Sequence, residues 1–222
     1  MPDRVEEARI AEFWAWFVQH ASDLARARPD ESPVLEELLQ SLQGIDSGLF
    51  YEICTDSSPH ELIVTAEGRR ELFPLVEAVV AAAPRLDGWI CIALKPAMGF
   101  GFQTSYEGTS FDPRSMWFLP LESSSNPMAS GLRVGVSGFD HVEERITKNA
   151  VLVILDTALG ERSAASDIQH MEVAALPPKP EDQGYIKLTE LADYIEWRKR
   201  KLADQGPSGG PCPAIWSAGI RS

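Results

Sequence analysis

The sequence predicts an α+β fold in which a mixed or antiparallel sheet is covered by helices, with a helical N-terminus and a C-terminal helix. Three observations lead to this prediction. The chain has 222 residues, of which 44% are hydrophobic and 24% charged, as in ordinary globular proteins. Its apolar residues recur at every third or fourth position in some segments and at every second position in others. Segments of the second kind follow one another directly, which is typical of α+β proteins and not of alternating parallel sheets.

The first half of the chain is expected to begin with two helices. Apolar residues over 10–24 fall on one helical stripe, and Ser32 followed by Pro33 favours the start of a second helix that ends near Gly44. A hairpin is predicted next, because turn-forming residues separate two short apolar runs. Helical spacing returns before Pro84, and the run of bulky apolar residues after it indicates an interior strand. These elements are the hairpin over 49–54 and 61–66, the helix over 69–83 and the strand over 89–94.

The second half is expected to contain several strands, one long helix and a terminal helix. Asp140 is predicted to cap the long helix over 142–159, and Gly160 is predicted to end it. Residues 150–155 are apolar nearly all round this helix. The apolar stripe is expected to consist of Val142, Ile146, Ala150, Val153 and Thr157. The remaining elements are strands over 100–106, 115–119, 132–136 and 168–176 and the terminal helix over 188–202.

The element order is compatible with a single domain over residues 1–204. A chain of this length can bury one sizeable core without disulfides. A weak domain boundary is predicted near residues 122–127, where the composition becomes typical of a loop. Residues 205–222 hold four glycines and three prolines without a period, so we expect a disordered tail.

The chain is acidic, with 33 acidic and 20 basic residues and a formal net charge of -13. This charge disfavours nucleic acid as a partner and favours an unidentified protein partner of basic character. The N-terminus lacks the features of a signal peptide, and no apolar run is long enough to cross a membrane. Three widely spaced cysteines fit neither a disulfide framework nor a metal site. We therefore expect a cytoplasmic protein that does not insert into membranes, with its oligomeric state left open.

The residues give little indication of catalysis. Asp140, His141 and Glu144 could hold a metal or act in a hydrolase, but a capping aspartate and a solvated first turn explain the same residues. Ser123 could be combined with His141 and Asp156, yet no G-x-S-x-G elbow surrounds the serine. Phosphate-binding loops are also missing. No catalytic residue, metal ligand or cofactor is therefore predicted, and a metal-assisted enzyme or hydrolase using Asp140, His141 and Glu144 is the alternative.

The candidate binding residues are Met98, Phe100, Phe102 and Trp16. The first three lie in a segment over 95–102 that combines aromatic residues, methionine and glycines, a composition that gives adaptable apolar surfaces. Packing of this segment against its own core is the alternative. Trp16 lies off the stripe of the first helix, so it either widens the buried face or contacts a partner. The predicted function is that of a non-catalytic module that binds a protein or a small ligand.

Four segments together resemble a family of uncharacterised bacterial proteins, with a match over roughly residues 10 to 200. They are Phe13-Trp14-x-Trp16-Phe17, Glu61-Leu62-Ile63-Val64-Thr65-Ala66-Glu67-Gly68, Ala81-Ala82-Ala83-Pro84-Arg85-Leu86-x-Gly88-Trp89 and Leu155-Asp156-x-x-Leu159-Gly160-Glu161. The resemblance implies an α+β fold. The family has no assigned reaction, so the resemblance assigns no functional residue in this chain.

Overall fold

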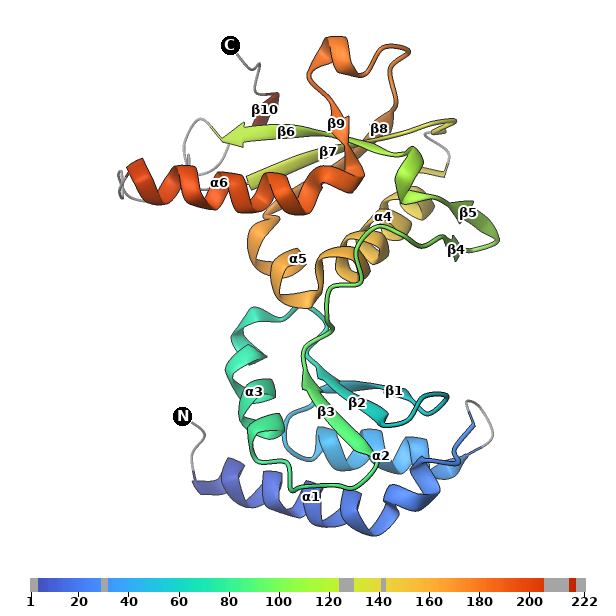
Figure 1. The fold of residues 1–222 in the computed structure, drawn as a ribbon, viewed down its shortest axis with the longest axis vertical. Coiled ribbons are helices and arrows are strands. Elements are labelled where there is room, and N and C mark those ends of the chain that lie inside the picture. The colour runs from blue at the N-terminus through green and yellow to red at the C-terminus, as the bar shows by residue number, and fades with distance from the viewer. Residues whose placement is uncertain (1–3, 29–31, 124–129, 141–142, 206–215, 219–222) are drawn as a thin grey trace. The chain divides into compact units, whose positions relative to one another are not determined.

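The computed structural model describes residues 4–28, 32–123, 130–140, 143–205 and 216–218 (Figure 1). It confirms the α+β fold with a helical N-terminus and a C-terminal helix. The chain divides into two compact units, residues 1–96 and residues 97–222, and each has its own sheet. None of the helices among the described residues combines the length and the apolar character needed to cross a bilayer.

The first unit is a three-stranded sheet with helices packed against it. Its elements are α1 (Arg4–Leu24), α2 (Pro33–Gln43), β1 (Phe50–Cys54), β2 (His60–Thr65), α3 (Phe73–Ala81) and β3 (Trp89–Ala93). The strand order is β1-β2-β3. β1 and β2 form the predicted antiparallel hairpin, whereas β3 runs parallel to β2 after a crossover through α3.

The core of the first unit follows the predicted stripe of α1. The buried residues of this helix are Ile10, Phe13, Trp14, Phe17 and Leu24. The indole Nε1 of Trp14 donates a hydrogen bond of 2.8 Å to the backbone carbonyl of Val79 in α3, so the stripe also ties two helices together. On the sheet, Leu62 and Val64 of β2 are completely buried. The helices therefore cover the sheet face that carries these two side chains.

The second unit is built on a mixed sheet. Its strands, in the order β10-β6-β7-β8 with β9 also paired to β6, are β6 (Trp117–Ser123), β7 (Ser130–Val136), β8 (His170–Ala175), β9 (Ile186–Lys187) and β10 (Trp216–Ala218). β7 and β8 are parallel, and the other pairs are antiparallel. The helices are α4 (Glu144–Leu159), α5 (Glu161–Asp167) and α6 (Leu191–Gln205). A separate two-stranded hairpin is formed by β4 (Thr104–Tyr106) and β5 (Thr109–Phe111).

The buried face of α4 differs from the predicted stripe. Val153 is 42% exposed, although it was expected to face the core. The buried apolar residues are Ala150, Val151, Ile154, Leu155, Ala158 and Leu159. The prediction was wrong because residues 150–155 are apolar all round, so periodicity could not select one face.

The two ends of α4 are also partly corrected. The helix begins at Glu144, and its N-cap is Glu143 without a capping side chain. Asp140 lies one turn earlier, where its carbonyl accepts a hydrogen bond of 3.1 Å from the backbone N–H of Glu143. Gly160 ends the helix with a φ of 77°, as predicted, and α5 starts directly after it.

The boundary between the two units falls at Pro96, not near residues 122–127. Most of the predicted boundary, residues 124–127, lies outside the described residues. The single domain over 1–204 stays a prediction, since a division by contacts does not show whether the units unfold together. In the expected tail, Trp216–Ala218 pairs with β6 as a strand, which the composition did not predict. The neighbouring tail residues lie outside the described part.

Candidate interaction surface

The segment predicted to bind a partner packs largely against its own unit. Met98 is 72% exposed, but Phe100 is only 7% exposed and belongs to the core, and Phe102 is half-buried against that core. The backbone N–H groups of Met98 and Gly99 each donate a 3.0 Å hydrogen bond, to the carbonyls of Thr157 and Ala158 respectively. These carbonyls lie in the last turn of α4, where no partner within the helix is available. The segment thus caps α4, and Met98 is its exposed apolar side chain.

Trp16 is half-buried on α1 and stacks on His20. The two ring centroids are 4.4 Å apart with 19° between the planes. The Nδ1 atom of His20 lies 2.8 Å from the carbonyl of Trp16, so this nitrogen is the donor. Trp16 belongs to the first unit, whereas Met98, Phe100 and Phe102 belong to the second. Each group is therefore described within its own unit, and a binding role for these four residues stays a prediction.

The residues of the enzymatic alternative do not form a described cluster. Asp140 and Glu144 are both exposed near the start of α4, and His141 lies outside the described residues. Across the described ranges, no three His, Cys, Asp or Glu side chains are grouped so that they could hold a metal ion.

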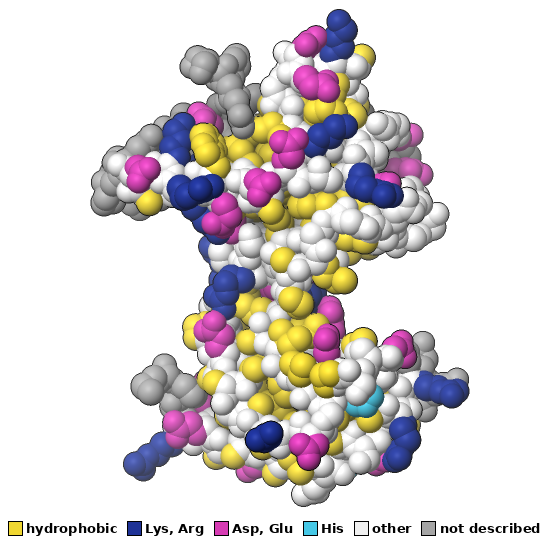
Figure 2. Space-filling model, viewed as in Figure 1, with side chains coloured by type: hydrophobic (Ala, Val, Ile, Leu, Met, Phe, Trp, Pro, Cys, Tyr) yellow, Lys and Arg dark blue, Asp and Glu magenta, His cyan; other side chains and the backbone are white. Residues whose placement is uncertain are grey.

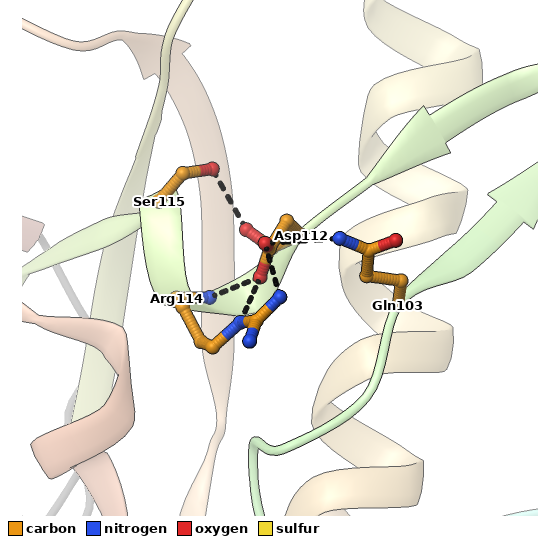
Figure 3. Close-up of polar contacts among 4 residues, drawn as sticks. All are labelled: Gln103, Asp112, Arg114 and Ser115. Atoms are coloured by element: carbon orange, nitrogen blue, oxygen red, sulfur yellow. Dashed lines mark hydrogen bonds and ion pairs between the residues drawn. The ribbon is translucent and has the colours of Figure 1, made fainter.

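A polar network in the second unit surrounds Asp112 and is structural (Figure 3). Its Oδ1 accepts hydrogen bonds from the backbone N–H and the Nε of Arg114, both at 2.9 Å. Its Oδ2 accepts from Arg114 Nη2 at 2.8 Å and from Gln103 Nε2 at 3.2 Å. The hydrogen bonds from Arg114 hold the pKa of Asp112 well below its usual value. A carboxylate with these bonds is a poor proton acceptor, and it serves to cap the 3-10 turn over Pro113–Ser115.

A second polar group lies on the sheet of the second unit. Arg133 of β7 pairs through Nε with Glu172 Oε1 of β8, and His170 Nε2 lies 3.8 Å from Glu172 Oε2. The hydrogen bond with Glu172 raises the pKa of Arg133. All three side chains are roughly one-third exposed, with relative areas of 37%, 39% and 35%. Such exposed ion pairs are typical of a solvated surface and contribute little to stability.

The first unit carries an apolar surface that the sequence did not reveal. β2 directs Leu62 and Val64 to the covered side of the sheet, and alternation places Ile63 on the other side. The register aligns Ile63 with Ile92 of β3, and Ile90 lies one row away on the same side. Ile90 is 45% exposed, while Ile63 and Ile92 are half-buried. Apolar side chains also reach the surface of the first unit where Figure 1 draws α3, a helix that packs against β2 and β3 (Figure 2).

Acidic side chains flank this surface. Glu52 aligns with Ile63 from β1, and Glu61 of β2 aligns with Ile90. Glu52 pairs with Lys95, whose Nζ lies 3.5 Å from Glu52 Oε1. No ion pair involves Glu61 among the described residues. We call the side chains of Glu52, Glu61, Ile63, Ile90 and Ile92 the open face.

The charge of the chain is concentrated in the unit that carries the open face. Residues 1–96 contain seventeen acidic and eight basic residues, an excess of nine acidic residues, whereas residues 97–222 contain sixteen acidic and twelve basic residues. The first unit therefore carries nine of the thirteen excess negative charges of the chain.

β3 is an edge strand, so the prediction of an interior strand was wrong. Among the described residues it pairs with β2 alone. The sequence is apolar at every position from Trp89 to Ala93, which is the usual pattern of a strand that is covered on both sides. Strand order depends on contacts between distant segments, so this local pattern could not show that one edge and one face are open.

Comparisons with family models, with curated proteins and with solved structures found no match to this chain. The resemblance to a family of uncharacterised bacterial proteins therefore stays a prediction.

Proposed function

We propose that this protein is a non-catalytic bacterial module that binds a basic protein partner in the cytoplasm. The observation that supports the proposal is the open face, where a half-exposed isoleucine surface lies beside Glu61 in a unit with an excess of nine acidic residues. Partner surfaces of this composition combine burial of apolar area, which supplies affinity, with opposite charge, which accelerates association.

The free thiols are compatible with a reducing compartment. Cys54 is exposed and Cys91 is half-buried, and both are unpaired. Disulfides persist in oxidising compartments and are rare in the cytoplasm. This observation supports the cytoplasmic part of the proposal, and the bacterial part is supported by the sequence resemblance.

The test is affinity purification from native cell extract, with the full chain as bait and mass spectrometry of the retained proteins. We expect a basic protein that is retained in 50 mM salt and released in 500 mM salt, because screening shortens the reach of exposed charges. The Glu61→Lys variant should lose this protein. Glu12→Lys makes the same charge change at an exposed position of α1 and should keep it.

Two results would contradict the proposal. One is retention of the same proteins by the parent chain and by Glu61→Lys, which would place binding elsewhere. The other is retention that salt does not weaken, which would remove the role of the acidic surface. Urea denaturation of both variants provides the control that neither substitution unfolds the first unit.

A further inference from the structure

We infer that the basic partner of the proposed function binds as an extended segment that adds a fourth strand to the outer edge of β3 and places a basic side chain beside Glu61. The inference rests on the proposed function and specifies how the partner is recognised. Strand addition uses main-chain hydrogen bonds for affinity and alternate side chains for specificity.

The outer edge of β3 carries backbone groups that point away from β2. The N–H of Leu94 donates a hydrogen bond of 2.8 Å to the carbonyl of Val64 in β2. Every second residue before Leu94 therefore also directs its N–H and C=O groups toward β2. Cys91 and Ala93 alternate with these residues and direct their N–H and C=O groups outward. The outward N–H of Trp89 is already bonded to the carbonyl of Leu86 at 3.3 Å. An incoming strand would therefore pair with Cys91 and Ala93.

Side-chain burial supports an edge that is open to solvent. Cys91 aligns with Leu62 on the helix-covered side of the sheet. Leu62 is completely buried, but Cys91 on the same row is only half-buried. This difference in burial means that Cys91, unlike Leu62, has no neighbouring strand on its outer side. Burial by the existing neighbours raises the pKa of the Cys91 thiol to about 11.

β3 is better suited to this role than β1, which is the other edge of the sheet. β1 carries Glu52 in its centre, whereas Trp89–Ala93 contains no charged residue. Charged residues on an edge oppose pairing with another strand, and an apolar edge favours it. The choice of edge follows from this difference.

The charges select a basic segment over a second copy of this chain. Neighbouring strands are spaced by about 4.8 Å, so an added strand would lie about 10 Å from β2. A lysine or arginine beside Ile90 can bridge this distance to Glu61, because both side chains are long and flexible. A second copy would instead bring together two units that each have an excess of nine acidic residues.

The probe for the test is a blocked octapeptide that alternates lysine and valine. Two further versions carry N-methyl groups, one on every lysine and the other on every valine. Amides of alternate residues point to the same edge of a strand, so each version blocks one edge only. We expect one N-methylated version to bind the full-length protein at least about tenfold more weakly and the other to bind like the parent peptide.

Hydrogen exchange and NMR locate the bound peptide on the full-length protein. The amides of Cys91 and Ala93 should become protected, and Glu61→Lys should weaken binding whereas Glu12→Lys should not. A peptide that alternates glutamate and valine should not bind.

Several outcomes overturn the inference. The two N-methylated versions could bind with equal affinity, or the peptide could protect amides outside β3 from exchange. The glutamate peptide could bind as tightly as the lysine peptide. The protein without peptide could form a dimer that Ile90→Lys dissociates. If a basic protein is captured by the parent and lost by Glu61→Lys while the N-methylated peptides behave alike, strand addition fails and the proposed function stands. If no basic protein is captured in low salt, the proposed function fails first.

Discussion

The segment that precedes β4 allows packing to be separated from binding by two substitutions. Phe100 is 7% exposed and lies in the core of the second unit, whereas Met98, two residues earlier, is 72% exposed. Replacing a buried phenylalanine by alanine removes its transfer free energy and leaves a cavity, which together cost about 3–5 kcal/mol. The small residual exposure of Phe100 favours the lower part of this range. We therefore expect Phe100→Ala to lower the free energy of unfolding of the second unit by about 3–4 kcal/mol.

Urea denaturation followed by hydrogen exchange and mass spectrometry measures each unit separately. With a urea dependence of about 2 kcal/mol per molar, the predicted loss moves the midpoint of peptides from α4 down by about 1.5–2 M. Met98→Ala should leave that midpoint within about 0.3 M, because exposed substitutions rarely change stability by more than about 0.5 kcal/mol. A midpoint for Phe100→Ala that equals that of the parent would refute the packing role and restore Phe100 as a candidate for binding.

The same titration tests the domain organisation. If the two units unfold independently, peptides from α1 keep their midpoint in Phe100→Ala while those from α4 shift. If residues 1–204 form one cooperative domain, as the sequence predicts, peptides from both units shift together.

Three further predictions concern single positions. At pH 8, Cys91 should react with iodoacetamide about a hundredfold more slowly than a thiol with the ordinary pKa of 9.0, because its pKa of about 11 leaves far less thiolate. Mass spectrometry measures the rate of this reaction. A rate for the folded protein that equals the rate in urea would contradict the prediction. Gly135→Ala should destabilise the second unit by about 1 kcal/mol, since a Cβ would lie 2.8 Å from Leu176 Cδ1. In Gly101→Ala the new Cβ meets no atom within 4 Å, so this control should not be destabilised. Equal urea midpoints of the two variants would argue against the predicted clash. Trp14→Phe removes the donor to Val79, so the first unit should lose about 1–3 kcal/mol in the same assay, and no loss would show that the bond adds nothing.

Local patterns predicted the elements of the fold well where one face of an element is apolar and the other is polar. The α1 stripe from Ile10 to Leu24 is the clearest case, because charged residues such as Glu12 mark the exposed side of the helix. The hairpin of β1 and β2 was also predicted, since its turn residues and both strands lie within sixteen residues of the chain, Phe50 to Thr65. The prediction for α4 was wrong for the opposite reason, because from Ala150 to Leu155 no polar side marks the surface of the helix.

The candidate site depended on information that no single segment carries. The residues of the open face come from β1, β2 and β3, and they become neighbours only through the strand order and register. The pattern of Trp89–Ala93 could not distinguish an edge strand from a central strand, because apolar residues occupy both of its faces. The acidic excess of residues 1–96 was visible in the sequence, but its meaning depended on a unit boundary at Pro96 that the composition did not mark.

An apolar edge strand is a hazard for a protein that must stay in solution, because its unpaired backbone groups can pair with any exposed strand, including that of another copy. Natural proteins commonly place a charge on the edge strand itself, yet Trp89–Ala93 has none. Here Asp87 and Lys95 flank the strand in the chain, and Glu61 lies on the neighbouring strand β2. Lys95 pairs with Glu52 of β1, so Glu61 is the carboxylate that an added strand would meet. Like charges on two copies repel each other, whereas the same negative charge attracts a basic strand. On the proposal made above, the acidic residues around β3 therefore serve two requirements at once: they oppose pairing between copies, and they leave the edge available to a basic segment.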